Sequence, residues 1–300
     1  MQTNSIDSNL LRLFSAFKGI TFNPAIHQYT FNETGTIANS VTGLLKKYTP
    51  PFDGENISRR YAEKHNITVE EVRNLWGVKN VCSTVKGSLI HYFIECYFRS
   101  TFYDLTAKST KDKVYNDFLE SMTKKARQDK FTFTGDAEQL VDKLLLEAAY
   151  VVNNHVKNYL RDSAALTPVG VELILGDESL ELCGSPDMIA YAPKTGGLII
   201  QDWKTNGAAI DEPNTFNKFI VIDKWKIPYT KLHEYSLQLS FYAGILRRKG
   251  IEVDSNGWLI HFSDINPNYV LHKCVDYSEV VEWVFAELEQ KFAWKQKKLN

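Results

Sequence analysis

Apolar and polar residues along this chain repeat with two different periods, and the changes of period divide it into helical and extended segments. Residues 1–20 and 83–102 place apolar side chains three or four positions apart, which predicts amphipathic helices. Residues 21–38 instead alternate apolar and polar positions around Asn32–Gly35, which predicts a β-hairpin with its turn at those residues. The chain is therefore expected to open with a helix and a hairpin.

Helical periods dominate from there to the middle of the chain. Residues 55–76 predict two helical pieces, residues 103–134 contain one amphipathic helix in a lysine-rich stretch, and residues 136–161 predict a long helix. We interpret the lysines of 103–134 as a solvated face, with contact to nucleic acid as the alternative. Ser40 and Thr42 precede a short apolar run, so either hydroxyl can cap a short helix there.

Three apolar, strand-like runs lie between Glu172 and Lys204, separated by glycine-containing turns. Asp187 stands at or just past the end of the second run, and Asp202 and Lys204 close the third. Because side chains alternate faces along a strand, Asp202 and Lys204 point the same way. Strands that deliver two acids and a lysine to one place indicate a site that holds a divalent cation beside a phosphate.

The last third of the chain returns to alternating helices and strands. Residues 205–232 carry few regular signals and are expected to form a long loop. A helix is predicted at 233–248, strands at 256–262 and 269–275, and a helix at 278–298. The order of elements predicts an α/β fold with a mixed sheet core flanked by helices and a helical N-terminal elaboration.

The length and composition fit one globular domain spanning residues 1–300. We expect residues 1–165 to form the hairpin and the helical part, and residues 166–300 to form the sheet core with the catalytic residues. The chain is 44% hydrophobic and has a formal net charge of −1. That charge argues weakly against a histone-like coating protein, but it allows a nuclease whose basic residues line one groove.

The cysteines lie far apart in sequence and form no Cys-x-x-Cys pair. This spacing argues against a zinc ribbon and an iron–sulfur cluster, and scattered thiols fit a reducing cytoplasm. No apolar run approaches the roughly 20 residues of a membrane span, so no membrane partner is expected.

Hydrolysis of a phosphodiester requires an activated water, a neutralised phosphate and a stabilised leaving oxygen, all of which carboxylate-bound divalent ions can supply. Mg²⁺ prefers oxygen ligands and keeps several waters, so Asp187, Asp202 and the backbone carbonyl of Trp203 suffice as ligands. Lys204 would orient or activate the water, or steady the charge on the phosphate.

Five short elements, in the right order along the chain, give it a family resemblance. Gly184-Ser-Pro-Asp187, followed fifteen residues later by Asp202-Trp-Lys204, resembles the motif of the PD-(D/E)xK nuclease superfamily. Gly87-Ser-Leu-Ile-His91 and Gln238-Leu-Ser-Phe-Tyr242 are similar to elements of its RecB-type and lambda-exonuclease-like branch. The stretch around Ser40 resembles phage-encoded exonucleases and the mitochondrial genome maintenance exonuclease. Ordered motifs are more specific than Asp-x-Lys alone.

This resemblance implies a restriction-endonuclease-like fold and assigns roles to the motif residues. Asp187, Asp202 and Lys204 would be the catalytic residues, and His91 would join Asp187, Asp202 and Trp203 as a ligand of Mg²⁺ or Mn²⁺. Residues with supporting roles near the ligands or at the DNA would be Glu95, Glu172, Gln238, Tyr242, Ser40 and Thr42.

Each supporting residue also has an ordinary structural interpretation. Glu172 is either a ligand or the partner of a lysine, and Glu95 is either close behind the ligands or an exposed helix acid. Gln238 and Tyr242 either position the site and the DNA backbone or pack their helix. The hydroxyls at 40 and 42 either contact phosphate or cap a helix, and these two roles are compatible.

The resulting expectation is a metal-dependent DNA exonuclease acting on DNA with a free end or a single-stranded portion. The resemblance implies a role in recombination, repair or replication of a phage or bacterium, in the host cytoplasm and beside a phage recombination or replication protein. The alternatives are a structure- or sequence-selective endonuclease on the same fold, a non-catalytic DNA-end-binding protein and, more remotely, an RNA-processing enzyme.

Overall fold

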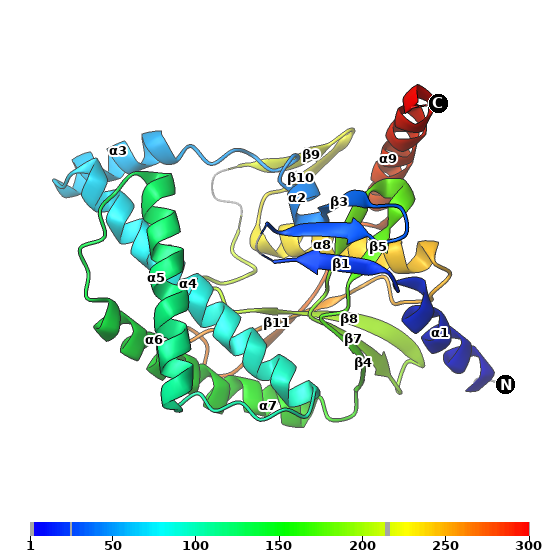
Figure 1. The fold of residues 1–300 in the computed structure, drawn as a ribbon, viewed down its shortest axis with the longest axis horizontal. Coiled ribbons are helices and arrows are strands. Elements are labelled where there is room, and N and C mark those ends of the chain that lie inside the picture. The colour runs from blue at the N-terminus through cyan, green and yellow to red at the C-terminus, as the bar shows by residue number, and fades with distance from the viewer. Residues whose placement is uncertain (1–2, 25, 214–216, 300) are drawn as a thin grey trace.

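A helical part stands beside a core of twisted sheets in the computed structural model, which describes residues 3–24, 26–213 and 217–299 (Figure 1). The fold is mixed α/β, as predicted. The helical part consists of α3 (Gly54–His65), α4 (Val69–Phe98), α5 (Lys108–Asp129), α6 (Ala137–Val151), the π-helical turn η1 (Val152–Val156) and α7 (Lys157–Asp162).

The central sheet has the strand order β12-β11-β8-β7-β4. It is mixed because β8 pairs parallel with β11, whereas the other neighbouring strands pair antiparallel. Its strands are β4 (Thr167–Val171), β7 (Met188–Ala192), β8 (Gly197–Lys204), β11 (Trp258–His261) and β12 (Val270–Lys273).

A second sheet has the order β1-β2-β3-β6-β5 and joins the N-terminal hairpin to the segment before β7. Its strands are β1 (Ile20–Asn23), β2 (Gln28–Phe31), β3 (Thr36–Ser40), β5 (Leu175–Asp177) and β6 (Leu182–Gly184), with the 3₁₀ turn η2 (Glu178–Leu180) before β6. The remaining elements are α1 (Thr3–Ala16), α2 (Val41–Leu45), β9 (Phe219–Ile222), β10 (Trp225–Pro228), α8 (Lys231–Arg248) and α9 (Ser278–Leu299).

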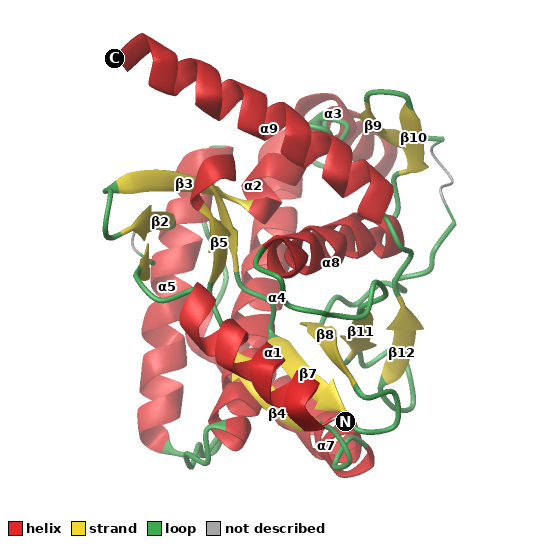
Figure 2. Ribbon diagram, turned by 90° about the vertical axis from the view of Figure 1, so that its right-hand side faces the viewer, coloured by secondary structure: helices red, strands yellow, loops and turns green. Residues whose placement is uncertain are grey.

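Two apolar clusters cover the two faces of the central sheet. Side chains such as Ile200 on β8 face the cluster formed with α8 and α9, while Ile199 faces the cluster formed with the helical part. Figure 2 shows α8 packed beneath α9 and beside the central sheet. The strand period that places Asp202 and Lys204 on one face therefore places them on the side of α8.

Several sequence predictions are confirmed. The hairpin turn falls between β2 and β3, and Ser40 caps α2. Helices α1, α5, α8 and α9 and strands β11 and β12 lie where their periods predicted. No helix in the described ranges is long and apolar enough to cross a membrane.

Two helix predictions need correction. The second piece of 55–76 and the segment 83–102 are one continuous helix, α4, because Val81 and Val85 keep its apolar stripe buried and Gly77 packs against a phenylalanine ring. The single helix predicted for 136–161 is interrupted by the π turn η1.

Two strand predictions are also corrected. The three runs predicted between Glu172 and Lys204 form four strands, β5 to β8, divided between two sheets. The expected loop at 205–232 contains the β9–β10 hairpin, whose two-residue turn includes Asp223 with φ 49°. Ile220 and Ile227 pack this hairpin against the apolar cluster on the α8 side of the central sheet. Tertiary packing therefore stabilises two strands that the local sequence did not predict. The division at residue 165 stays a prediction.

Candidate active site

The site is built where β8 runs past the start of β7. The first residue of β7 pairs with Gln201, so Asp187, one position earlier, lies beside Asp202 and Trp203. The two strands interlock there: Trp203 N–H donates to Asp187 Oδ2 at 2.5 Å, and Asp187 N–H donates to Asp202 Oδ1 at 3.4 Å. The fifteen-residue spacing of the motif therefore brings both acids to one strand end.

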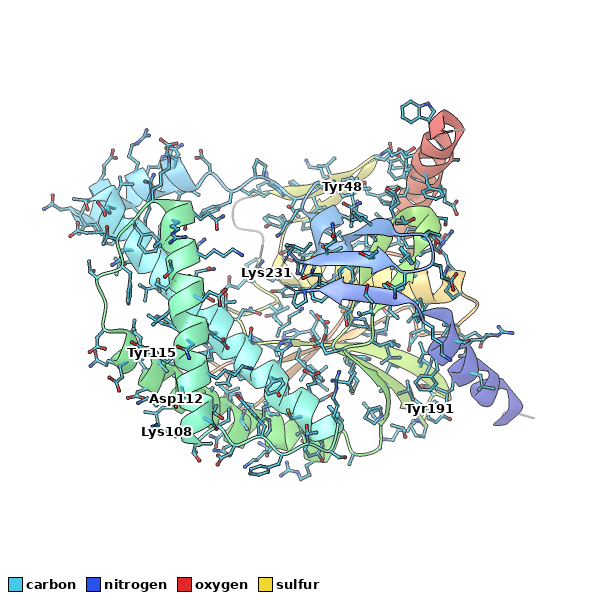
Figure 3. The ribbon with its side chains drawn as sticks, in the orientation of Figure 1. Tyr48, Lys108, Asp112, Tyr115, Tyr191 and Lys231 are labelled. Atoms are coloured by element: carbon cyan, nitrogen blue, oxygen red, sulfur yellow. The ribbon has the colours of Figure 1, made fainter. Side chains whose placement is uncertain are left out.

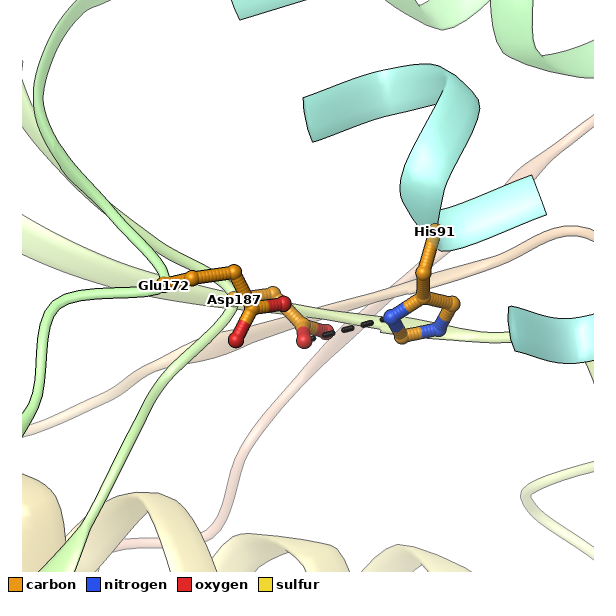
Figure 4. Close-up of side chains that lie close together, drawn as sticks. All are labelled: His91, Glu172 and Asp187. Atoms are coloured by element: carbon orange, nitrogen blue, oxygen red, sulfur yellow. Dashed lines mark ion pairs between the residues drawn. The ribbon is translucent and has the colours of Figure 1, made fainter. Parts of the chain in front are cut away.

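Helix α4 brings His91 to the same place. His91 Nδ1 lies 3.3 Å from Asp187 Oδ1 (Figure 4). A Cβ on Gly87, one turn earlier, would lie 2.7 Å from Thr205 Oγ1, just beyond the end of β8. The glycine therefore allows the helix to approach the strand end, and this approach sets the position of the imidazole.

Glu172 completes a cluster of three potential ligands. One ligand atom from each of His91, Glu172 and Asp187 lies within 4.8 Å of the others, and in the described ranges no other trio of His, Cys, Asp and Glu meets this condition. Glu172 follows the end of β4 with φ 52° instead of lying on a strand as expected. Its N–H donates to the Asp187 carbonyl at 3.1 Å, and Ser185 Oγ donates to its Oε2 at 3.4 Å.

Asp202 is held differently from the other two acids. Its Oδ1 accepts from the Asp187 N–H, and its Oδ2 is paired with the Lys204 ammonium. Trp203 is fully buried, and its ring lies between His91 and Phe98, stacked on the latter at 6.1 Å. Since the N–H and C=O of a strand residue point to the same edge, the Trp203 carbonyl faces the Asp187 side. The ligand roles of Asp202 and Trp203 stay predictions.

Burial and mutual repulsion shape the charges of the acids. Burial raises the pKa of Glu172, and the neighbouring Asp187 carboxylate adds to this, bringing the pKa to about 8. Burial and Asp187 likewise raise the pKa of Asp202 to about 6. Burial opposes ionisation of Asp187 too, but His91 and Lys204 outweigh it and lower the pKa of that carboxyl. A cation among these acids would relieve the repulsion.

Lys204 has a second partner that the sequence did not suggest. Its Nζ lies 4.2 Å from the centroid of the Tyr235 ring, a cation–π contact. Lys231, at the start of α8, lies 5.6 Å from the same centroid and faces the helical part (Figure 3). Tyr235 precedes Gln238 by one helical turn, and that spacing is the one sequence signal that could have found it.

Tyr242 packs α8 against Gly184 at the end of β6, and Gln238 holds its hydroxyl from within the helix. Gln238 Nε2 donates to the Tyr242 hydroxyl at 2.8 Å, and the Tyr242 ring is almost fully buried. A Cβ on Gly184 would lie 2.5 Å from Tyr242 Cε1. The glycine of the Gly184–Asp187 motif therefore provides the space that the Tyr242 ring occupies. The structure thus gives Tyr242 the packing role, and the DNA contact expected for Gln238 stays a prediction.

The other supporting residues lie around this centre. Ser40 Oγ accepts from Gly43 N–H at 3.0 Å and lies 3.2 Å from Thr42 Oγ1, which confirms the capping interpretation. Ser40 pairs with Cys183 of β6, which precedes Gly184. The hydroxyls of Ser40 and Thr42 therefore lie near the end of β6. Glu95 pairs with Arg99 at 2.9 Å, and its charge contributes to the raised pKa of Glu172.

A mixed sheet that presents acids, a lysine and a histidine at one strand end is the arrangement of a hydrolytic nuclease. The chain belongs to the PD-(D/E)XK nuclease superfamily, whose family model matches residues 66–295. A comparison with curated protein sequences finds no significant match. Among the solved structures, the crystal structure of SSO0001 is 13% identical with a TM-score of 0.25, and the match covers 53% of this chain and 64% of that one.

Replacing Gly87 by valine should move α4 away from Thr205 and withdraw His91 from Asp187. We expect Gly87→Val to weaken Mn²⁺ binding about tenfold or more, because one ligand leaves the cluster. Isothermal titration calorimetry measures this, with Ser83→Val on the exposed face of α4 as the control for a β-branched residue in the helix. Equal Mn²⁺ affinity in the two variants would contradict this role of Gly87.

Removing the charge of Glu172 should stabilise the metal-free protein. The pKa of Glu172 is raised from 4.5 to about 8, so the folded state loses stability as the pH rises through that window. In EDTA at pH 9 we expect Glu172→Gln to raise Tm by about 3 °C, with no change at pH 4. Added Mg²⁺ should raise the Tm of the wild type more than that of the variant.

Differential scanning fluorimetry at both pH values, with and without Mg²⁺, tests this expectation. The control is Glu63→Gln, which removes an exposed acid from α3. A Tm gain at pH 9 that is the same in both variants would show that the site is not electrostatically strained.

Proposed function

We propose that this chain is a divalent-metal-dependent deoxyribonuclease that hydrolyses DNA from its ends. The observation that carries the proposal is the buried cluster at the end of β8, where like-charged acids lie together beside one lysine. Such a cluster is costly unless a cation joins it, and functional sites are where such costs are found.

The residues present fit a hard divalent ion. Oxygen donors are provided by Glu172 and Asp187, with one imidazole nitrogen from His91, and further oxygens lie near on Asp202 and the Trp203 carbonyl. Mg²⁺ or Mn²⁺ matches this set because both accept several oxygens and keep waters for the remaining positions. A bound ion of this kind would polarise the phosphate and lower the pKa of a bound water.

Lys204 would act beside the ligands. Its ammonium is held between the Asp202 carboxylate and the Tyr235 ring, and the Asp202 charge keeps its pKa above the ordinary value even though burial opposes this. A permanently charged ammonium suits a residue that steadies a phosphate or orients a water, rather than a general base. Tyr235 would keep the ammonium in place when Asp202 turns to a cation.

The preference for DNA ends rests on the resemblance to the exonuclease branch. Of the two motifs that distinguish this branch, Gly87–His91 brings its histidine to Asp187, and Gln238–Tyr242 packs its tyrosine on Gly184, the glycine of the Gly184–Asp187 motif. The same resemblance supports a role in DNA recombination, repair or replication of a phage or bacterium, in the cytoplasm and together with other recombination or replication proteins.

Substitution of the acid or the lysine at the end of β8 should abolish cleavage. We expect Asp202→Asn and Lys204→Met each to slow Mg²⁺-dependent hydrolysis of end-labelled linear DNA by about 10³-fold or more, since each removes transition-state stabilisation. The control, Lys194→Met, removes an exposed lysine from the β7–β8 turn. EDTA should stop the wild type, and closed circular DNA should stay intact.

A time course on linear and closed circular DNA separates the alternatives. Full activity of either variant would overturn the proposed site. Cleavage of closed circles by the wild type would identify an endonuclease, and binding without cleavage in Mg²⁺ and in Mn²⁺ would identify an end-binding protein.

The Tyr235 ring should matter through Lys204 and not through the tyrosine hydroxyl. We expect Tyr235→Phe to keep the wild-type kcat, because the ring face is retained, and Tyr235→Leu to lower kcat about tenfold with little change in KM. Steady-state kinetics on linear DNA provides both constants. Equal losses in the two variants would assign the effect to the hydroxyl or to packing.

A further inference from the structure

A mixed polar and aromatic cavity is lined by α4, the helix that also carries His91. It has a volume of about 340 Å³ and lies between α4 and α5. Its α4 wall includes Ser88, three positions before His91, and Tyr92, one position after it. Nothing in the cluster at the end of β8 uses these side chains.

Aromatic rings form one wall of this cavity. Tyr92 is 42% exposed, although it lies two turns inside the C-terminal end of α4. Tyr103, in the segment after α4, meets it edge to face at a centroid distance of 4.7 Å. The contact with Tyr103 orients the Tyr92 ring. Tyr92 remains open to a planar ligand, and an oriented, accessible ring is what stacking of a base requires.

The charges at the cavity specify how a nucleotide would enter. Lys113 of α5 places its Nζ 5.0 Å from the Tyr92 ring centroid, and its exposed ammonium is free to exchange this ring for a phosphate. Asp117 and Glu120, exposed on the same helix, repel phosphate and accept hydrogen bonds from the amino groups of a base. A base would thus enter the cavity with its phosphate towards Lys113.

We propose that this cavity binds one unpaired nucleotide of the DNA substrate, with the base on Tyr92 and the backbone phosphate at Lys113. The inference rests on the proposed function, because it places a binding position for the DNA substrate on the helix that carries His91. A paired base cannot stack there, so the cavity selects DNA with a single-stranded portion.

Fluorescence anisotropy in EDTA tests the proposal without cleavage. Two labelled probes are compared, a blunt duplex and the same duplex with a short single-stranded tail. We expect Tyr92→Ala to weaken binding of the tailed duplex about tenfold and to leave the blunt duplex unchanged, since stacking of one base is worth about 1–3 kcal/mol. Tyr92→Phe should bind both probes like the wild type.

The matched control is Tyr97→Ala, which removes a 55% exposed tyrosine of the same helix outside this cavity and should leave both affinities unchanged. Lys113→Gln is a second, surface variant, and we expect it to weaken the tailed probe alone. Wild-type affinity of Tyr92→Ala and Lys113→Gln for the tailed duplex would overturn the inference, as would equal losses on both probes.

The failure of this inference and of the proposed function are distinguishable. If the wild type shows Mg²⁺-dependent cleavage but Tyr92→Ala keeps its affinity for the tail, the nucleotide position alone is wrong. If the wild type neither cleaves nor binds either probe, the nuclease proposal itself fails.

Discussion

The site depends on one backbone interlock between the ends of two strands. Asp187 accepts the Trp203 N–H, and Asp202 accepts the Asp187 N–H, so each acid is oriented by the backbone that carries the other. Backbone donors cannot move without disturbing the sheet, and the acids are therefore held close despite their repulsion. The same contacts fix where His91 and Lys204 must come to compensate the charge, and so they determine how α4 and α8 pack.

Two glycines make that packing possible, and this explains why the Gly87–His91 and Gly184–Asp187 motifs each begin with one. Gly87 lets α4 reach Thr205 at the end of β8, and Gly184 provides space for the Tyr242 ring of α8. A side chain at either position would push a helix away from the acids. The motifs are thus read better as close-approach contacts between a helix and a strand end than as collections of reactive groups. Their chemistry and their packing are inseparable.

The sequence predicted the parts of the site that follow from periodicity. The two-residue spacing of Asp202 and Lys204 predicted their common face. The role of His91 was implied by the family resemblance and not by a period. Glu172 was uncertain because no period governs it: it lies after β4 in a left-handed conformation and enters the cluster through hydrogen bonds to Asp187 and Ser185. Tyr235 was missed because a cation–π contact across elements leaves no local signature. The β9–β10 hairpin was missed because its two short strands are stabilised by burial against the core.

The continuity of α4 connects these observations. A break near residues 77–82, as the sequence suggested, would have allowed the His91 half of the helix to move independently of the rest. Instead the helix is uninterrupted for 30 residues, and Gly77 packs against Phe131 beyond the end of α5. Packing of the helical part is therefore transmitted along a rigid element to the imidazole. Tyr92 follows His91 on α4. The same rigid helix therefore carries a residue of the acid cluster and a wall of the α4–α5 cavity, and it fixes the distance between the two.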